Sequence, residues 1–284
     1  MRNILYSIGF LLVLEGCVKQ TTWPVKDAIP VKVVVDAILT DEVKSQQVRL
    51  TYSVTQLNQS PQPVVGASVI ISNEDSIWNL TEHPANSGIY LTSPAFFIRL
   101  KKNYNLLISH NNTVYSAKAT MLPGSFFPEL RYSKNEKNDL YHVDWVANAF
   151  SSQDAAMWEL RIDWSVVPGY EHLDSIANHA RMLFYTLPTL DVSEVFAPQM
   201  EAIWFPAGTV ITERRYSITP EHAEFIRELL LETNWTGGLF NVAAANVTTN
   251  LSNGAIGFFG VCAVNELSVI VVSGNPPQRK KYFQ

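Results

Sequence analysis

The chain has few cysteines, few charged residues and no apolar run long enough to cross a bilayer as a permanent helix. Cys17 and Cys262 are its only cysteines, so a framework of several disulfides is excluded. Charged residues make up 17% of the 284 residues and the formal net charge is −5. Because its lysines and arginines are scattered, the sequence lacks the basic patch of a nucleic-acid-binding protein. A chain of this length can bury a core without disulfides.

The amino-terminal residues have the pattern of an export signal. Arg2 is followed by an uncharged run from Ile4 to Leu14, which is too short to span a hydrocarbon core of ~30 Å as a helix. The run ends in Leu14-Glu15-Gly16-Cys17, which resembles a bacterial lipobox except at Glu15. We therefore expect a signal peptide at 1–16, a lipid anchor on Cys17 and a tether at 17–30. The alternative is a buried strand that contains a cysteine by chance.

The first half of the chain has the pattern of short β-strands. β-Branched and aromatic runs of period two alternate with polar turns at intervals of about ten residues, and no helical pattern lies among them. We expect residues 31–122 to form a β-sandwich of the immunoglobulin-like or carboxypeptidase-regulatory-like kind. The expected strands are 31–39, 48–54, 67–72, 77–80, 89–91 and a hairpin at 104–117 that turns at His110 to Asn112.

The second half, 123–284, is expected to be a β-rich domain with one prominent helix. In 158–166 the apolar residues Trp158, Leu160, Ile162, Trp164 and Val166 alternate with polar ones, which predicts a strand with one buried and one wet face. We expect 141–146 to be its antiparallel neighbour, with Tyr141, Val143 and Trp145 on the buried side. Thr219, Pro220 and Glu221 predict the start of a helix over 219–232, whose apolar face holds Phe225, Ile226, Leu229 and Leu230.

The sequence carries no recognised catalytic motif, and we expect it not to be an enzyme. A Gly-x-Ser-x-Gly nucleophile elbow is absent from the sequence, and the glycines from Gly254 to Gly260 have the wrong spacing for a dinucleotide loop. They predict a bulge or close packing instead. His172 and His179, with Glu171 and Asp174, favour a solvated segment over a metal site, because zinc sites use tighter spacings and further ligands. We expect no catalytic residue, no metal and no cofactor.

Aromatic residues are numerous and most are expected in the core, as is Cys262. Alternation assigns Trp145, Trp158 and Trp164 to buried positions. Trp78, Trp204 and Trp235 remain candidates for surface contacts with a partner or a sugar, because aromatic side chains are enriched at interfaces.

The segment from Asn246 through Asn250, Gly254 and Gly257 to Gly260, with Phe258 and Phe259, resembles the C-terminal signature of the family known as domain of unknown function 4249. The strand that opens at Gly208 and the helix after Thr219 fit the same pattern, while Ala245 stands where many members have proline. Residues 66–71 and 87–90 resemble the family's N-terminal sandwich. The asparagines and glycines of the signature predict turns, bulges and close packing rather than catalysis.

The resemblance implies a Bacteroidetes outer-membrane lipoprotein, encoded near TonB-dependent transporters. We therefore expect a lipid-anchored, non-enzymatic accessory or binding protein, whose partners are outer-membrane lipid, a TonB-dependent barrel and a glycan or peptide ligand. In that lineage Asp-Ser-Ile resembles an O-glycosylation motif, which marks Ser76 and Ser175. A secreted glycan-acting hydrolase with an unrecognised carboxylate pair, and a structural or adhesive surface protein, remain alternatives, because sequence does not show the distance between carboxylates.

Overall fold

The structure is a computed structural model that describes residues 30–54, 58–125, 128, 130–189, 203–233 and 247–274. The expected signal peptide, Cys17 and nearly all of the tether lie outside these residues, as do Trp235 and Asn246. Residues 1–31 and 32–284 are separate units. In the described part of 32–284 the chain is mainly β, as the sequence predicts, and no helix there is long and apolar enough to span a bilayer.

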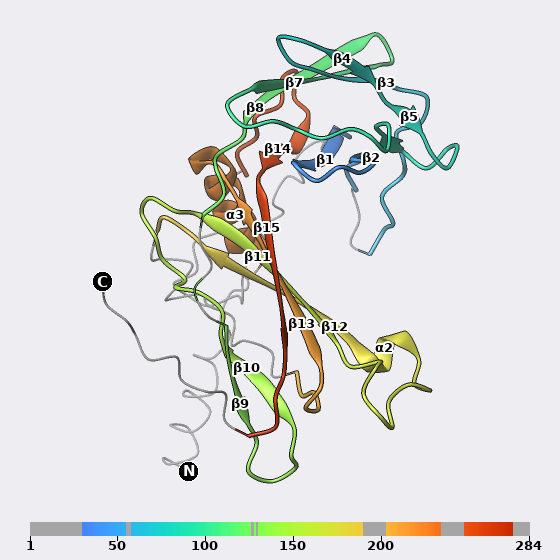
Figure 1. Ribbon diagram of the computed structural model, residues 1–284. Helices are drawn as coiled ribbons and strands as arrows, with labels where there is room; N and C mark the ends of the chain where they lie inside the picture. Colours follow the sequence, from blue (N-terminus) through green and yellow to red (C-terminus); the bar gives the residue numbers. More distant parts are fainter. Residues whose placement is uncertain are drawn as a thin grey trace, which may run out of the picture. The chain divides into compact units, whose positions relative to one another are not determined.

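The strands predicted before residue 122 form two sheets that enclose one core (Figure 1). The five-stranded sheet has the order β14-β1-β2-β6-β5 and the four-stranded sheet the order β4-β3-β7-β8. Their strands are β1 (Val33–Thr40), β2 (Gln47–Tyr52), β3 (Ser68–Ser72), β4 (Ile77–Asn79), β5 (Thr81–Glu82), β6 (Ile89–Leu91), β7 (Asn103–His110), β8 (Thr113–Thr120) and β14 (Ile256–Cys262).

Alternation of side chains builds this core. Val33, Val35, Ala37 and Leu39 of β1 are all buried, and they pack with alternate residues of the second sheet. The β7–β8 hairpin turns at Asn111 and Asn112, both with positive φ, which confirms the predicted turn. Asparagine tolerates this left-handed backbone better than most residues.

The second half of the chain forms a four-stranded antiparallel sheet of order β12-β11-β13-β15 and a separate hairpin of β9 and β10. The sheet comprises β11 (Ala156–Asp163), β12 (His179–Thr186), β13 (Val210–Ser217) and β15 (Val264–Ile270), and the hairpin comprises β9 (Arg131–Lys134) and β10 (Tyr141–Trp145). The prediction that β10 is the neighbour of β11 is wrong. Both edges of β11 are taken by β12 and β13.

Two expectations for the strand at 158–166 are also wrong. The strand ends at Asp163, whose side chain accepts hydrogen bonds from the backbone N–H and hydroxyl of Ser165, and the chain then turns so that Val166 is 66% exposed. Glu159, expected on the wet face, is only 3% exposed. Trp158, Leu160 and Ile162 are buried as predicted, and Trp145 is half-buried.

The segment from β14 to β15 joins the two halves of the chain, with only Ala263 between the two strands (Figure 1). β14 pairs in parallel with β1, and β15 pairs antiparallel with β13. The expected division at residue 122 therefore leaves out one strand of the first sandwich, because β14 is supplied from the far end of the chain.

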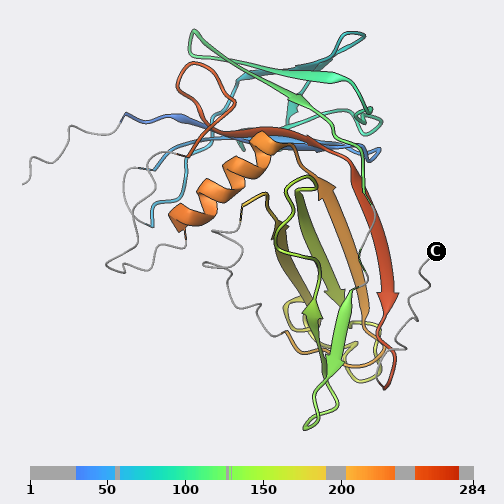
Figure 2. The ribbon, with the colours of Figure 1, turned by 90° about the vertical axis from the view of Figure 1, so that its left-hand side faces the viewer.

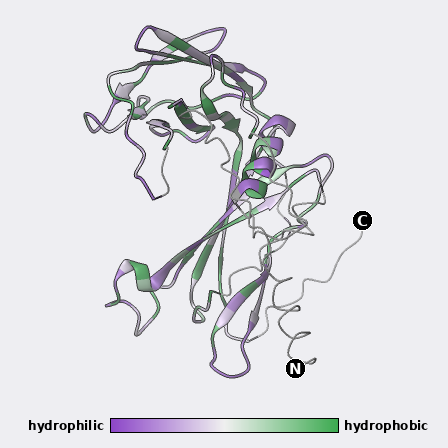
Figure 3. Cartoon of the chain, turned by 180° about the vertical axis from the view of Figure 1, so that it is seen from behind, coloured by the Kyte–Doolittle hydropathy of each residue, from purple (hydrophilic) through white to green (hydrophobic). Residues whose placement is uncertain are grey.

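Helix α3 (Pro220–Thr233) confirms the helix predicted at 219–232 and packs beside β14 (Figure 2). It carries both hydrophobic and hydrophilic residues (Figure 3). Ala223 and Ile226 are buried against Cys262, whereas Leu229, expected on the apolar face, is 42% exposed. The only other helix in the described ranges is the single turn α2 (Ser175–Asn178).

Candidate functional site

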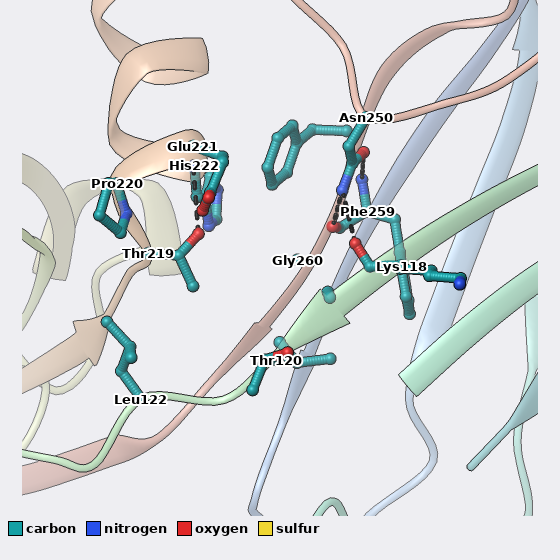
Figure 4. A pocket seen from close by; sticks show the side chains of 13 residues that line it. Lys118, Thr120, Leu122, Thr219, Pro220, Glu221, His222, Asn250, Phe259 and Gly260 are labelled. Atoms are coloured by element: carbon teal, nitrogen blue, oxygen red, sulfur yellow. Dashed lines mark hydrogen bonds between the residues drawn. The ribbon is translucent and has the colours of Figure 1, made fainter. Parts of the chain in front are cut away.

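A cavity of about 430 Å³ lies where the start of α3 meets β8 and β14 (Figure 4). β8 and β14 are edge strands of the two sheets, so the cavity sits at an open side of the sandwich. Its lining combines residues of the signature segment with residues that the sequence did not single out. It is lined by Lys118, Ala119, Thr120, Leu122, Thr219, Pro220, Glu221, His222, Asn250, Phe258, Phe259, Gly260 and Val261.

The start of α3 places His222 in the cavity wall. The hydroxyl of Thr219 accepts a hydrogen bond from the backbone N–H of His222 at 3.3 Å, and its carbonyl accepts one from Ala223 at 2.9 Å. Pro220 has no N–H and suits the first helical position. Thr219 thus caps the helix and fixes its first turn, as the sequence predicts.

The His222 side chain is held between β14 and the helix. It is 2% exposed, and its ring stacks on Phe258 with the ring centroids 4.6 Å apart. Burial lowers the pKa of His222 to about 4, so the ring is neutral at pH 7. Neither ring nitrogen has a hydrogen-bond partner among the described residues. A neutral imidazole offers one hydrogen-bond donor and one acceptor.

Gly260 makes room for this ring. A Cβ added at Gly260 would lie 3.0 Å from both Cε1 and Nδ1 of His222. Gly257, with φ of 97°, has a different need, because a Cβ there would overlap the carbonyl oxygen of Val35 in the neighbouring strand. The two glycines of the signature are therefore required by close packing, as the sequence predicts.

Asn250 closes part of the gap between the two edge strands. Its Nδ2 donates to the carbonyls of Phe259 at 2.7 Å and Lys118 at 3.2 Å, and its Oδ1 accepts from the N–H of Phe259 at 3.1 Å. The side-chain amide therefore pairs with β14 as the main chain of a neighbouring strand would. The sequence predicts turns at the asparagines of the signature, whereas the side chain of Asn250 bonds residues nine and 132 positions away.

The next outward-facing residue along each edge strand is Val261 on β14 and Thr120 on β8, and among the described residues no side-chain amide like that of Asn250 bonds the main chain of either. Backbone groups point alternately to the two sides of a strand, so those of Val261 face the same way as those of Phe259, and those of Thr120 the same way as those of Lys118. Val261 is paired with Leu39 and Thr120 with Asn103 within their own sheets. Outside these strand pairs, no hydrogen bond joins the N–H or C=O of either residue to another residue that the structure describes. Both residues line the cavity.

The charged side chains at the cavity lie at its rim. Glu221 is exposed in the first turn of α3, and Lys118 is exposed on β8, with its side chain directed away from α3 (Figure 4). The interior of the cavity therefore combines apolar walls, a neutral histidine and unpaired main-chain groups.

A second cluster of polar residues lies on one face of the β11–β13 region and is already saturated. Glu159 accepts hydrogen bonds from Tyr216 and Arg181, both at 2.7 Å, and from Arg161 at 3.1 Å. Burial alone would raise the pKa of Glu159, but these hydrogen bonds outweigh it and lower the pKa to about 2. Arg214 lies 3.6 Å from Glu159 and bonds Glu42 at 2.7 Å. The cluster holds the β1–β2 loop to the C-terminal sheet and is structural.

The aromatic residues predicted for surface contacts are not brought together. Trp78 is half-buried against the sandwich core, with its ring 5.0 Å from that of Phe96. Trp204 is 38% exposed and lies 4.5 Å from the ring of His142, beside β10. Trp235 lies outside the described residues.

A serine, an aspartate and a histidine do meet beside Trp204, but in the wrong order for nucleophilic catalysis. The hydroxyl of Ser133 and Nε2 of His142 both bond Oδ1 of Asp144, at 2.9 and 2.8 Å. A serine nucleophile needs the histidine within hydrogen-bond reach, and here the carboxylate stands between them.

The histidine pair of the sequence analysis does not share a helix. His172 is exposed in a loop, whereas His179 opens β12 after the four residues of α2, with its Nε2 3.3 Å from Asp163. The seven-residue spacing of the two histidines therefore does not place both rings on one face of a helix. Among the described residues no group of three His, Cys, Asp or Glu side chains is placed to hold a metal ion.

The two predicted glycosylation positions are both exposed. Ser76 is exposed in the turn before β4, where its N–H bonds the side chain of Asn73, and Ser175 is exposed at the start of α2. Their glycosylation stays a prediction. Cys262 is fully buried, and burial raises the pKa of its thiol to about 12, which confirms the expected small core residue.

Comparison with known proteins identifies one family. The model of the family described as "Domain of unknown function (DUF4249)" matches residues 19–268. This range includes every residue that lines the cavity. A search of the curated proteins finds no match to the chain.

Proposed function

Because the chain belongs to the family of the domain of unknown function DUF4249, we propose that it is a lipid-anchored outer-membrane protein that binds a partner without catalysis. The observation that carries the proposal is the cavity between β8, β14 and α3. Residues of the family's signature segment build its wall, and their side chains are used for packing and backbone pairing rather than for chemistry. In this proposal the accessory partner is a TonB-dependent transporter.

The anchor is proposed from the sequence. Several acyl chains on Cys17 would hold the protein stably on a bilayer, whereas a single chain binds only marginally. Cys17→Ser is expected to release the protein from the membrane fraction after a salt wash. Cys262→Ala is the matched control, because it removes the other cysteine and keeps the anchor. Membrane retention of the Cys17→Ser protein equal to that of the control would overturn the proposed attachment.

The transporter partnership is tested by co-purification from detergent-solubilised outer membranes. The wild-type chain is expected to retain a TonB-dependent barrel, and Thr120→Arg, which places a long charged side chain in the cavity, is expected to lose it. Thr113→Arg is the matched control, because Thr113 begins the same strand, β8, and does not line the cavity. Equal recovery of the barrel with the two variants would show that the cavity is not needed for binding the transporter.

The sequence also left a glycan-acting hydrolase open. Glu159 and Glu213 are the buried carboxylates of the described residues. Residues directly opposite each other on neighbouring strands share a face of the sheet, and successive residues alternate between faces. Glu213 is opposite Leu160, the residue next to Glu159, so the two carboxylates lie on opposite faces. These two groups therefore do not face one another across a substrate, and no observation favours this second function over binding.

A further inference from the structure

We propose that the cavity receives the main chain of an extended peptide segment from a partner protein, paired with the free backbone groups of Val261 and Thr120. This inference rests on the proposed binding function and names the chemistry of its ligand. The two edge strands define the receiving groups, and the chain's own Asn250 shows what kind of group fits between them.

Asn250 is a template for the ligand. Its carboxamide is chemically a short peptide group, with N–H donors and a carbonyl acceptor in one plane. It bridges the gap between Phe259 on β14 and Lys118 on β8 through three hydrogen bonds. The amide group of Asn250 therefore fits between the two edge strands at this position.

Val261 and Thr120 repeat that arrangement one step further along. They lie two residues beyond Phe259 and Lys118, which corresponds to about 6.6 Å along a strand. This is the repeat of an extended peptide, so a segment that continues from the Asn250 position would present its next amide to Val261 and Thr120. Figure 4 shows Asn250 at one end of this gap, Thr120 at the other and Gly260 between them.

The rest of the cavity can accept a side chain of the bound segment. Leu122, Pro220 and Phe258 supply apolar walls, and the neutral ring of His222 offers a donor and an acceptor. Main-chain pairing to a sheet edge provides affinity, and pockets for alternate side chains provide specificity, in the general mode of strand addition.

A free anion fits the same cavity less well. Helix starts bind anions through unpaired N–H groups, but Pro220 has none, and those of His222 and Ala223 are already bonded to Thr219. Glu221 adds a negative charge at the rim. An amide-containing ligand meets the unpaired groups without this repulsion.

The test uses the full chain in detergent micelles and two synthetic probes. The first probe is the blocked peptide acetyl-Thr-Val-Thr-Val-Thr-amide, which is extended and has both donors and acceptors along its main chain. The second has the same sequence with its internal amides N-methylated, so that its donors are removed. Binding is followed by the shifts of backbone amide resonances at about 1 mM probe, where even weak association is detectable.

We expect the first probe to shift the Val261 and Thr120 resonances and the second to bind at least about tenfold more weakly, since two lost hydrogen bonds amount to roughly a factor of ten. Thr120→Arg should abolish the shifts and Thr113→Arg should leave them. Absence of shifts at Val261 and Thr120, or equal binding of both probes, would overturn the inference. Neither probe requires a variant to fold.

Peptide binding and co-purification of a transporter can succeed or fail independently. Co-purification of a transporter without peptide binding would retain the accessory role and reject the strand-addition ligand. Peptide binding without co-purification would retain the ligand chemistry and reject the transporter partner.

Discussion

Replacement of Asn250 by alanine is expected to destabilise the sandwich by about 2–3 kcal/mol. The change removes the three hydrogen bonds by which the side chain bridges Phe259 and Lys118. Phe259 is fully buried, and its N–H and C=O lose the partners that satisfy them. A buried polar group left without a partner costs about 1–3 kcal/mol. Water from the adjacent cavity can reach the N–H and C=O of Phe259, so their combined cost is smaller than twice that value.

The measurement is guanidinium unfolding of the full-length chain, followed by tryptophan fluorescence. Asn73→Ala is the matched control. Asn73 also accepts two backbone hydrogen bonds, from Asp75 and Ser76, but it does so in an exposed turn where water can replace it. Its loss is expected to cost no more than about 1 kcal/mol.

Asn250→Asp separates the donor from the acceptor. The aspartate keeps an oxygen for the N–H of Phe259 but loses both bonds that Nδ2 donates, and its second oxygen faces the carbonyls of Phe259 and Lys118. We expect it to be at least as destabilised as Asn250→Ala at pH 7. If Asn250→Ala unfolds within about 0.5 kcal/mol of the wild type, or Asn250→Asp is as stable as the wild type, the bridging role of the amide is wrong.

Three further predictions use the same unfolding assay. Gly260→Ala is expected to cost about 1–3 kcal/mol, because its Cβ would press on the buried His222 ring at 3.0 Å; unchanged stability would show that the ring moves freely. Arg214→Met is expected to cost about 3 kcal/mol by leaving Glu42 and its neighbours without their buried cation, and a neutral result would mean that water already shields the cluster. Burial raises the pKa of Glu213 from 4.5 to about 7. Folding therefore favours its protonated form, and stability is lost as pH rises from about 4.5 through 7. Glu213→Gln should remove that loss, and be more stable than the wild type at pH 8 but not at pH 4; parallel stability curves of the two proteins would contradict this.

Local patterns predicted the elements of the fold well. The β1 alternation, the asparagine turn between β7 and β8, and the Thr219 cap of α3 are each decided by residues a few positions apart. The pairing of β14 with β1 was missed, because the two strands lie at opposite ends of the chain. β9 was not predicted as a strand, so β10 was given the wrong neighbour although β9 and β10 form a local hairpin.

The burial of Glu159 shows the same limit for a single residue. Strand alternation assigns it to the wet face, and it does lie on the face opposite Trp158. It is nevertheless buried, because Arg161, Arg181 and Tyr216 cover it and donate hydrogen bonds to it, and the last two come from other strands.

The candidate site was predicted only in part. Glycine-rich sequence around Gly257 and Gly260 indicated close packing, and the structure supplies the groups that require it, Val35 and His222. His222 itself carried no signal, since a histidine in the first turn of a helix is common on a protein surface. The unpaired backbone of Val261 was equally hidden, because main-chain groups are the same in every sequence until the neighbouring strands are known.

Hydrogen exchange of two backbone amides tests the central claim, that one edge position is filled by Asn250 and the next is open to a ligand. The account predicts slow exchange at Phe259, whose N–H is bonded to Asn250, and much faster exchange at Val261, although both side chains are buried. Addition of the blocked pentapeptide should then slow exchange at Val261. Strong protection of Val261 in the free protein would contradict the account, because the edge would already be occupied.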